Sequence, residues 1–165
     1  MSKIRVVHYI NQFFAGVGGE EQAHIAPELR KELPPISTQL QGKLGEDFEV
    51  VATVVCGDSY FNENLESVQK ELLEMIKGCE PQLFIAGPAF NAGRYGVAAG
   101  TITKAVQDEL HIPAVTAMYE ENPGTDMFKK DVYILETSDS AAGMRKALPK
   151  LAKFATKLAK GEEIL

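Results

Sequence analysis

The chain reads LFIAGPAFNAGRYG over residues 83–96, and this stretch decides the fold. The uninterrupted apolar run at its start is typical of a strand that is buried on both faces. The Gly-Pro pair that follows ends the strand and turns the backbone. Residues 97–110 then show a helical pattern, which His111-Ile112-Pro113 ends. The sequence therefore predicts a strand, a glycine-rich turn and a helix in succession.

Polar side chains in this turn indicate a ligand site. In an open α/β sheet such turns lie at the carboxyl ends of the strands, where ligands bind, and glycine lets the backbone approach a ligand closely. Asn91, Arg94 and Tyr95 supply an amide, a fixed cation and a phenol, which suit a small anionic or zwitterionic ligand. The glycine spacing fits neither the dinucleotide-binding nor the Walker pattern. The alternative is that the glycines serve turn geometry only and that Arg94 is a solvated surface charge.

Length and charge limit the class of protein. At 165 residues, with 45% hydrophobic residues, the chain can form one well-buried domain, which we expect to span residues 1–165. A net charge of -6 argues against binding to nucleic acid, which needs clustered Lys and Arg. No apolar run approaches the roughly 20 residues that span a bilayer, and the N-terminus leads into a strand rather than a signal peptide. We therefore expect a cytoplasmic protein with no nucleic-acid or membrane partner.

The two cysteines, Cys56 and Cys79, offer neither a disulfide framework nor a metal-binding spacing. We expect both to be reduced thiols, and we expect no metal and no cofactor. Cys56 stands where a strand gives way to a turn, so its sulfur could line the same crevice as the turn after Gly87. A nucleophilic thiol needs a neighbour that lowers its pKa, and Asp58 acts in the opposite direction. A small buried side chain is the simpler interpretation of Cys56.

Four further segments are short and rich in apolar and β-branched residues. They predict strands over residues 4–10, 48–55, 114–118 and 131–135. Helical patterns fill most of the gaps between the strands. This alternation predicts an α/β fold, which we expect to be a flavodoxin-like three-layer sandwich with a mostly parallel five-stranded sheet.

Capping residues and prolines predict the helix boundaries. Asn62 or Asn64 can cap the helix that follows the second strand. A polar residue among 138–140 can cap the last helix, and Pro149 should kink that helix or start it afresh. Between residues 22 and 47, prolines and glycines interrupt any long helix.

The first strand runs into the glycine-rich loop NQFFAGVGGEE over residues 11–21. In the expected topology this loop faces the turn after Gly87, and the turn at Cys56 and the loop at Glu120 form the walls. We expect Arg94 to bind a ligand carboxylate, because its planar guanidinium can contact both oxygens. No residue is assigned a catalytic role. The candidate substrate-binding residues are Asn11, Gln12, Cys56, Asp58, Asn91, Arg94, Tyr95 and Glu120.

Some residues near these loops have simple structural explanations. Glu120 and Glu121 are adjacent on an extended chain, so at most one of them faces a pocket, and an exposed charged loop explains both. Phe13 and Phe14 must pack against the domain itself or against a partner, and we favour the domain. His8, inside the first strand, is expected to be a packed imidazole with one hydrogen bond.

Four long runs of the sequence carry a family resemblance: VHYINQFFAGVGGEE (7–21), VVCGDSYFNEN (54–64), GPAFNAGRYG (87–96) and MYEENPG (118–124). In this order they resemble the N-terminal part of the selenoprotein subunit of component B of glycine, sarcosine and betaine reductases. The resemblance implies a complex of anaerobic bacteria that reductively removes the amino group of a small amino-acid derivative and gives acetyl phosphate, with thioredoxin as reductant. It also implies that a selenocysteine attacks the substrate α-carbon and passes a carboxymethyl group to component A. A pyruvoyl-type subunit would hold glycine as a Schiff base.

Members of that family are much longer and carry their selenocysteine in a later portion, which this sequence lacks. Neither Cys56 nor Cys79 stands in the selenocysteine motif. We therefore expect a subunit or fragment that works in an oligomer with a selenocysteine-bearing polypeptide, the pyruvoyl-type subunit and component A. One alternative is a non-catalytic flavodoxin-like module that binds a small carboxylate or a partner protein. Another is a flavin-binding electron carrier, which the lack of a hydroxyl-rich loop after the first strand disfavours.

Overall fold

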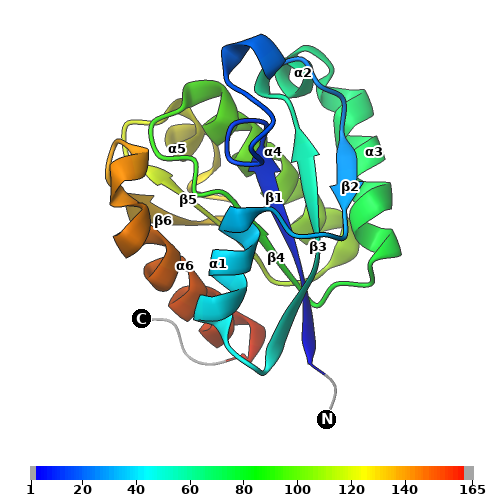
Figure 1. Cartoon of the computed structure of the whole chain (residues 1–165), viewed down its shortest axis with the longest axis vertical. Helices are drawn as coiled ribbons and strands as arrows, with labels where there is room; N and C mark the ends of the chain where they lie inside the picture. Colours follow the sequence, from blue (N-terminus) through cyan, green and yellow to red (C-terminus); the bar gives the residue numbers. More distant parts are fainter. Residues whose placement is uncertain (1–2, 162–165) are drawn as a thin grey trace.

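A six-stranded sheet forms the middle of the molecule, with helices on both of its faces (Figure 1). The computed structural model describes residues 3–161. Its strand order is β2-β3-β1-β4-β5-β6, and every neighbouring pair is parallel except β2 and β3. The predicted α/β class with a mostly parallel sheet is confirmed, but the antiparallel edge strand β2 makes six strands rather than five. The strands are β1 (Ile4–Asn11), β2 (Glu28–Arg30), β3 (Phe48–Cys56), β4 (Leu83–Ala86), β5 (Ala114–Tyr119) and β6 (Tyr133–Thr137).

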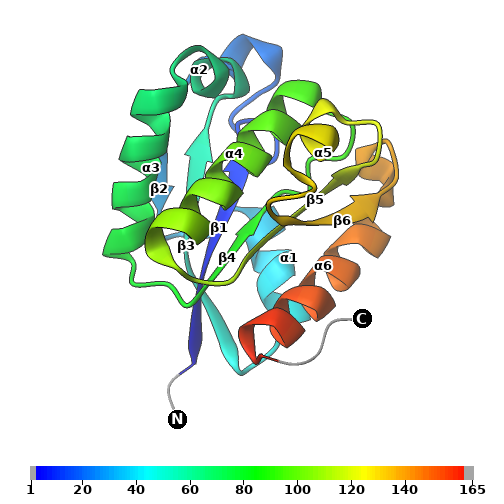
Figure 2. The same ribbon diagram turned by 180° about the vertical axis from the view of Figure 1, so that it is seen from behind.

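The helices fall into two groups according to the face of the sheet that they cover (Figure 1, Figure 2). One face carries α1 (Pro35–Leu44) and α6 (Met144–Ala159). The other face carries α2 (Asp58–Glu63), α3 (Leu65–Gly78), α4 (Gly93–Leu110) and α5 (Pro123–Phe128). Short 3-10 turns at Glu20–Gln22 and Ala141–Gly143 lie in the loops after β1 and β6.

Across residues 3–161, no helix has the length and apolar character that crossing a membrane requires.

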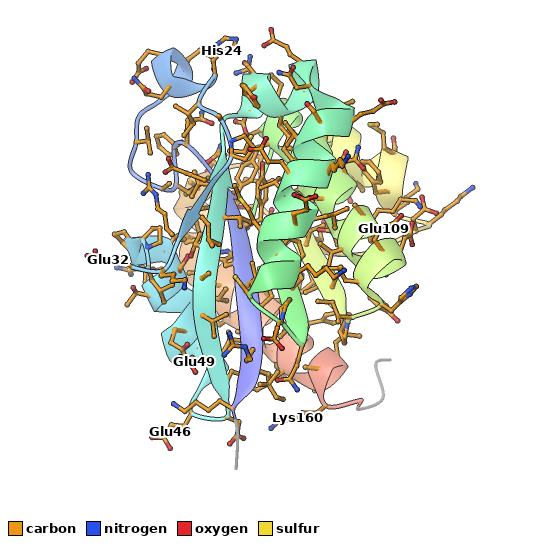
Figure 3. All side chains as sticks on the ribbon, turned by 90° about the vertical axis from the view of Figure 1, so that its right-hand side faces the viewer. His24, Glu32, Glu46, Glu49, Glu109 and Lys160 are labelled. Carbon is orange, nitrogen blue, oxygen red and sulfur yellow. The ribbon has the colours of Figure 1, made fainter. Side chains whose placement is uncertain are left out.

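Alternating side chains of β1 build both halves of the core. Val7 and Tyr9 pack with α3 and α4, whereas Val6 and Ile10 pack with α1 and α6. All four side chains of β4 are fully buried, which explains its continuous apolar sequence. Charged side chains such as Glu49 and Glu109 point outward (Figure 3).

Three short elements, β2, α2 and α5, have no counterpart among the predicted elements. The three residues of β2 pair antiparallel with the outer edge of β3, where Leu29 lies opposite Val54. α2 begins at Asp58, so helical structure starts before the asparagines expected to cap it. Asn64 lies at the junction of α2 and α3, and its side chain makes no capping hydrogen bond. Three-residue and six-residue elements are too short for a periodic pattern to identify.

The loop after β1 is held over the start of α2 by a close backbone contact. The Ala23 carbonyl accepts hydrogen bonds from the backbone N–H groups of Ser59 and Tyr60, at 2.8 and 3.0 Å. A Cβ atom on Gly57 would lie 2.3 Å from that carbonyl oxygen, so only glycine fits there. This contact brings the segment after β1 to the carboxyl end of β3.

Pro149 was expected to kink the last helix or to start it afresh. Helix α6 runs without interruption through Pro149, so the fresh start is wrong, and the kink stays a prediction. Leu148 and Leu151 are 2% and 0% exposed and pack against the sheet on either side of the proline. This shared core holds both parts of α6 in one helix, although proline removes an internal hydrogen bond. The helix begins after a 3-10 turn, and no side chain among residues 138–140 makes a capping hydrogen bond.

Candidate functional site

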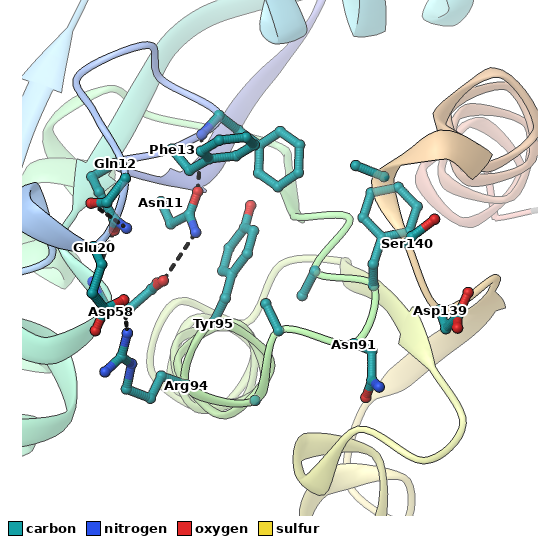
Figure 4. A pocket seen from close by; sticks show the side chains of 17 residues that line it. Asn11, Gln12, Phe13, Glu20, Asp58, Asn91, Arg94, Tyr95, Asp139 and Ser140 are labelled. Carbon is teal, nitrogen blue, oxygen red and sulfur yellow. Dashed lines mark hydrogen bonds and ion pairs between the residues drawn. The ribbon is translucent and has the colours of Figure 1, made fainter.

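A cavity of about 630 Å³ lies where several strands end at the carboxyl edge of the sheet (Figure 4). The segments that line it are the loop after β1, the start of α2, the turn between β4 and α4, and the loop after β6. The loop after β1 and the turn after Gly87 therefore meet at one site, although they are far apart in the sequence.

Six of the eight candidate residues line this cavity, and two do not. Cys56 is fully buried, and its sulfur lies 3.5 Å from the Gly57 carbonyl and 3.9 Å from the Ile25 carbonyl. Glu120 is exposed in the loop after β5 and is not part of the lining. The six that line the cavity are Asn11, Gln12, Asp58, Asn91, Arg94 and Tyr95.

Hydrogen bonds join the end of β1 to the start of α2. Asn11 Nδ2 donates to Asp58 Oδ2 at 3.0 Å, and Asn11 Oδ1 accepts from the Phe14 backbone N–H at 3.0 Å. Gln12 Oε1 accepts from the Asp58 backbone N–H at 3.1 Å. The parallel register places Asn11 beside Cys56, so Asp58 is the second residue beyond the paired end of β3. Strand pairing thus brings these side chains together.

Asp58 is a buried carboxyl group with one oxygen that has no partner. Asp58 is 5% exposed, and its Oδ1 atom makes no hydrogen bond within residues 3–161. Burial raises the pKa of Asp58, and the hydrogen bond from Asn11 and the charge of Arg94 partly oppose that rise.

Aromatic side chains form one wall of the cavity around Tyr95. The Tyr95 ring is fully buried, with its centroid 5.9 Å from that of Phe14 and 6.1 Å from that of Tyr9. Burial raises the pKa of the Tyr95 phenol well above its usual value, the charge of Asp58 adds to the rise, and a hydrogen bond with the Asn11 backbone opposes it. Phe14 also lies 6.2 Å from Phe90, while Phe13 is 58% exposed at the rim. The phenylalanine pair therefore divides between the core and the surface.

Arg94 lies at the rim of the cavity, in the first turn of α4, and forms an ion pair with Glu20 (Figure 4). Their side chains are 48% and 72% exposed. The hydrogen bond from Arg94 lowers the pKa of Glu20. The Arg94 backbone carbonyl accepts from Asn62 Nδ2 at 3.1 Å, which ties α4 to α2. Glu20 is a lining residue that the sequence analysis missed, and its only signal is an acidic residue in the loop that faces Arg94.

The turn that carries Asn91 is held by a buried asparagine that the sequence analysis also missed. Asn122, 1% exposed, donates from Nδ2 to the carbonyls of Phe90 and Ala92, at 2.9 and 3.1 Å. Phe90 has a left-handed backbone with a φ of 50°, and the Asn91 backbone N–H donates to the Asp139 carbonyl at 3.2 Å. Asn122 thus holds the turn between β4 and α4 in place. The available signal was the Asn-Pro-Gly sequence at residues 122–124, which begins α5.

His8, on β1, also contacts the turn that follows β4. Its Nε2 lies 2.8 Å from the Gly87 carbonyl and its Nδ1 lies 2.8 Å from Ser37 Oγ. A carbonyl only accepts, so Nε2 carries the proton and Nδ1 accepts from the Ser37 hydroxyl. Complete burial lowers the pKa of His8 to about 4. The imidazole has two hydrogen bonds rather than the expected one.

The chemistry of these residues is that of recognition rather than of nucleophilic attack. Burial raises the pKa of Cys56 to about 12, so the thiolate is scarcely populated at neutral pH. Within residues 3–161, no group of three or more His, Cys, Asp or Glu side chains could hold a metal ion. The cavity offers a guanidinium, a carboxyl group, amides and aromatic rings, which suit a small polar molecule.

Comparison with known proteins gives a match over nearly the whole chain. Residues 3–165 match the family described as glycine/sarcosine/betaine reductase selenoprotein B. No solved structure matches the chain.

Similar proteins come from reductases that are named for three different substrates. The chain is 74% identical over 164 residues to the glycine reductase complex component B subunit gamma of Peptoclostridium litorale, covering 99% of this chain and 38% of that protein. It is 60% identical to the sarcosine reductase complex component B subunit beta of Peptoclostridium acidaminophilum, covering 98% of this chain and 37% of that protein. It is 40% identical to the betaine reductase complex component B subunit beta of the same organism, covering 97% of this chain and 36% of that protein. The chain spans little more than a third of the length of these relatives, and it belongs to the glycine/sarcosine/betaine reductase selenoprotein B family.

Proposed function

We propose that this chain forms part of component B of a glycine, sarcosine or betaine reductase, and that its cavity belongs to the substrate pocket. The reaction would remove the amino group of a small amino-acid derivative reductively and lead to acetyl phosphate. The observation that carries this proposal is the cavity itself, which gathers Asn11, Asp58 and Arg94 from three separate segments of a chain in this family. A substrate carboxylate would bind the guanidinium of Arg94, which can make paired hydrogen bonds.

The nucleophile of the reaction would come from outside this chain. Cys56 is buried with a pKa of about 12, and Cys79 is 8% exposed and outside the cavity lining. A selenocysteine-bearing polypeptide would supply the selenol, and a pyruvoyl-type subunit and component A would complete the complex.

Reconstitution tests the proposal. Acetyl phosphate formation would be measured with the selenocysteine-bearing polypeptide, the pyruvoyl-type subunit, component A and the thioredoxin system, with and without this chain. Glycine, sarcosine and betaine would be supplied separately, and an equal mass of albumin would replace the chain as the control. We expect one of the three substrates to give acetyl phosphate faster when the chain is present. Equal rates with the chain and with albumin, for all three substrates, would contradict the proposal.

We also propose that the fold is flavodoxin-like and forms one domain. The parallel strands run in the order β3-β1-β4-β5-β6, which corresponds to the order 2-1-3-4-5 of that fold when only these five are counted. The two clusters of the core lie on opposite faces of one sheet, which supports a single folding unit.

A further inference from the structure

One side of α6, together with the residue that ends it, carries a dense group of basic side chains. Residues 141–160 contain six Lys and Arg residues and no Asp or Glu, which leaves 11 basic and 23 acidic residues elsewhere, a net charge of -12. Spacings of three or four residues place the basic side chains on one side of the helix. The members of this basic face are Arg145, Lys146, Lys150, Lys153, Lys157 and Lys160. Lys157 is half-buried and the other five are exposed.

The fold does not account for the basic face. Within residues 3–161, Lys160 is its one member that forms an ion pair, with Asp47 at 3.3 Å. On α4, by contrast, Lys104 pairs with Asp108 one turn further along the helix. Like charges three or four residues apart recur along the basic face, and such pairs destabilise a helix. A row of charges that weakens its own helix indicates a partner outside the chain.

An exposed aromatic pair and an open strand edge adjoin the basic face (Figure 2). β6 is the outermost strand, and in the described part of the chain it pairs with β5 alone. Tyr133, at its start, is 48% exposed, and its ring centroid lies 5.3 Å from that of Phe154 on α6. An unpaired edge can accept a strand from another chain, and exposed aromatic side chains often anchor protein interfaces.

A cavity of about 370 Å³ lies at the other end of the same surface. Its lining includes Thr137 and Ser138 at the end of β6 and Lys146 and Lys150 on α6. Lys150 Nζ donates one hydrogen bond, to the Glu136 carbonyl at 2.8 Å, and an ammonium group has two further N–H bonds to offer. Two ammonium groups beside two hydroxyl groups suit the oxygens of a carboxylate.

We propose that the surface between β6 and α6 docks an acidic segment of a partner protein. Carboxylates of the segment bind Lys146 and Lys150, and an apolar side chain of the segment packs on Tyr133. β6 covers about 13 Å, so an extended segment of about five residues reaches from one contact to the other.

This surface lies outside the candidate substrate cavity, so the inference goes beyond the proposed function. The loop between β6 and α6 separates the two cavities, because Asp139 and Ser140 line the larger one and Gly143 lines the smaller one. A partner that docks on the surface therefore lies beside the larger cavity without entering it.

The charge distribution favours a protein over the two other anionic partners. A nucleic acid extends well beyond a helix of about 24 Å, and the net charge of -12 on the rest of the chain repels it. A membrane-surface helix needs an apolar side that enters the lipid, whereas Leu148 and Leu151 of α6 are buried against the sheet. A short acidic segment stays within the basic face.

Synthetic peptides test the proposal. The probe is a capped hexapeptide with two glutamates at one end and a leucine at the other, made in both chain directions, and glutamine replaces glutamate in the control. Amide chemical shifts of the isotopically labelled chain would give the dissociation constants. We expect the acidic peptide to bind about fivefold more tightly than the control, with the largest shifts at Tyr133, Ser138 and Lys146. Equal binding by both peptides, no binding, or shifts centred elsewhere would overturn the proposal.

Charge-reversal variants locate the contact. Lys146→Glu combined with Lys150→Glu should weaken binding of the acidic peptide at least about tenfold. The matched control combines Lys70→Glu with Lys77→Glu, which makes the same change in net charge at exposed positions of α3, on the opposite face of the sheet. An equal loss in both double variants would mean that overall charge attracts the peptide, and the docking surface would be wrong. Thermal unfolding would show that each variant is folded.

Two further probes distinguish the classes of partner. They are a DNA duplex of about 20 base pairs and lipid vesicles with about 30% phosphatidylserine, each at about 150 mM salt. Fluorescence anisotropy would detect binding of the duplex, and co-sedimentation would detect binding to vesicles. We expect neither to bind. Binding of either one that the Lys146→Glu and Lys150→Glu double variant abolishes would assign the surface to nucleic acid or to membrane and overturn the proposal.

Discussion

Asn11 and Asp58, 47 residues apart in the sequence, are joined by a hydrogen bond of 3.0 Å at the carboxyl ends of β1 and β3. The bond links the loop after β1 to the first turn of α2, and both segments line the cavity. It also leaves one Asp58 oxygen unpaired at the site. This pair therefore joins two of the segments that build the cavity.

Removal of the Asn11 side chain should destabilise the fold. Asn11→Ala leaves Asp58 Oδ2 and the Phe14 backbone N–H without a partner, and we expect the free energy of unfolding to fall by about 1–3 kcal/mol. Urea denaturation would measure the change. Asn64→Ala is the control, since Asn64 is exposed and its 3.0 Å bond to the Tyr60 carbonyl lies outside the cavity lining. A loss no larger for Asn11→Ala than for Asn64→Ala would contradict the role given to Asn11.

His8 should make stability depend on pH. Its pKa in the folded chain is about 4, below the ordinary value of 6.5, so the unfolded chain binds the proton more readily. The stabilisation is therefore complete above pH 6.5 and is lost as the pH falls toward 4, by about 3 kcal/mol in total. Urea denaturation across this range would measure the loss in the natural chain and in His8→Gln. The same dependence on pH in both proteins would rule out His8 as its source.

Arg94 should bind ligand carboxylate through its planar fork. Arg94→Lys keeps the charge but loses the paired N–H groups, and we expect glycine to bind about tenfold more weakly. Arg145→Lys is the matched control, because Arg145 is exposed on α6 and outside the cavity lining. Titration calorimetry would compare the three proteins. An unchanged dissociation constant in Arg94→Lys would remove Arg94 from the site.

Gly96 should not accept a larger side chain. A Cβ atom there would lie 2.1 Å from Asn122 Oδ1, and Asn122 is held by its bonds to Phe90 and Ala92. We expect Gly96→Ala to lower the free energy of unfolding by about 1–3 kcal/mol. Gly42→Ala on α1 meets nothing within 4 Å, and we expect it to be neutral or to raise stability by up to about 1 kcal/mol. Thermal unfolding would compare the two variants. A higher unfolding temperature for Gly96→Ala than for Gly42→Ala would contradict the close contact between Gly96 and Asn122.

The sequence predicted which loops meet at the cavity, because a single rule of parallel sheet geometry decides this. Parallel strands present their carboxyl ends at one edge, so the loop after β1 and the turn after β4 could be expected to meet there, and Asn11 and Arg94 both line the cavity. Strict alternation also accounts for Cys56, which shares the face of β3 that carries Val54 and packs into the core under α3 and α4. Its side chain was therefore directed away from the cavity by its position in the strand.

Other features depend on contacts that no local pattern encodes. The ion pair of Glu20 with Arg94 requires the loop after β1 to reach α4, and the contact of Ala23 with the start of α2 holds that loop in place. The three residues of β2 form a strand only because the edge of β3 is available to pair with them. Asn122, in the loop after β5, donates a hydrogen bond to the Phe90 carbonyl in the turn after β4. These residues meet only after the sheet has assembled, so a local sequence pattern does not reveal the contacts.

The central claim is that the cavity at the carboxyl edge of the sheet is where a small amino acid binds. Titration of glycine into the isotopically labelled chain, followed by amide chemical shifts, tests it most directly. We predict that the largest shifts occur at Asn11, Asp58 and Tyr95. Shifts centred instead on residues 136–150, where a second and smaller cavity lies, or no shifts at all, would contradict the account.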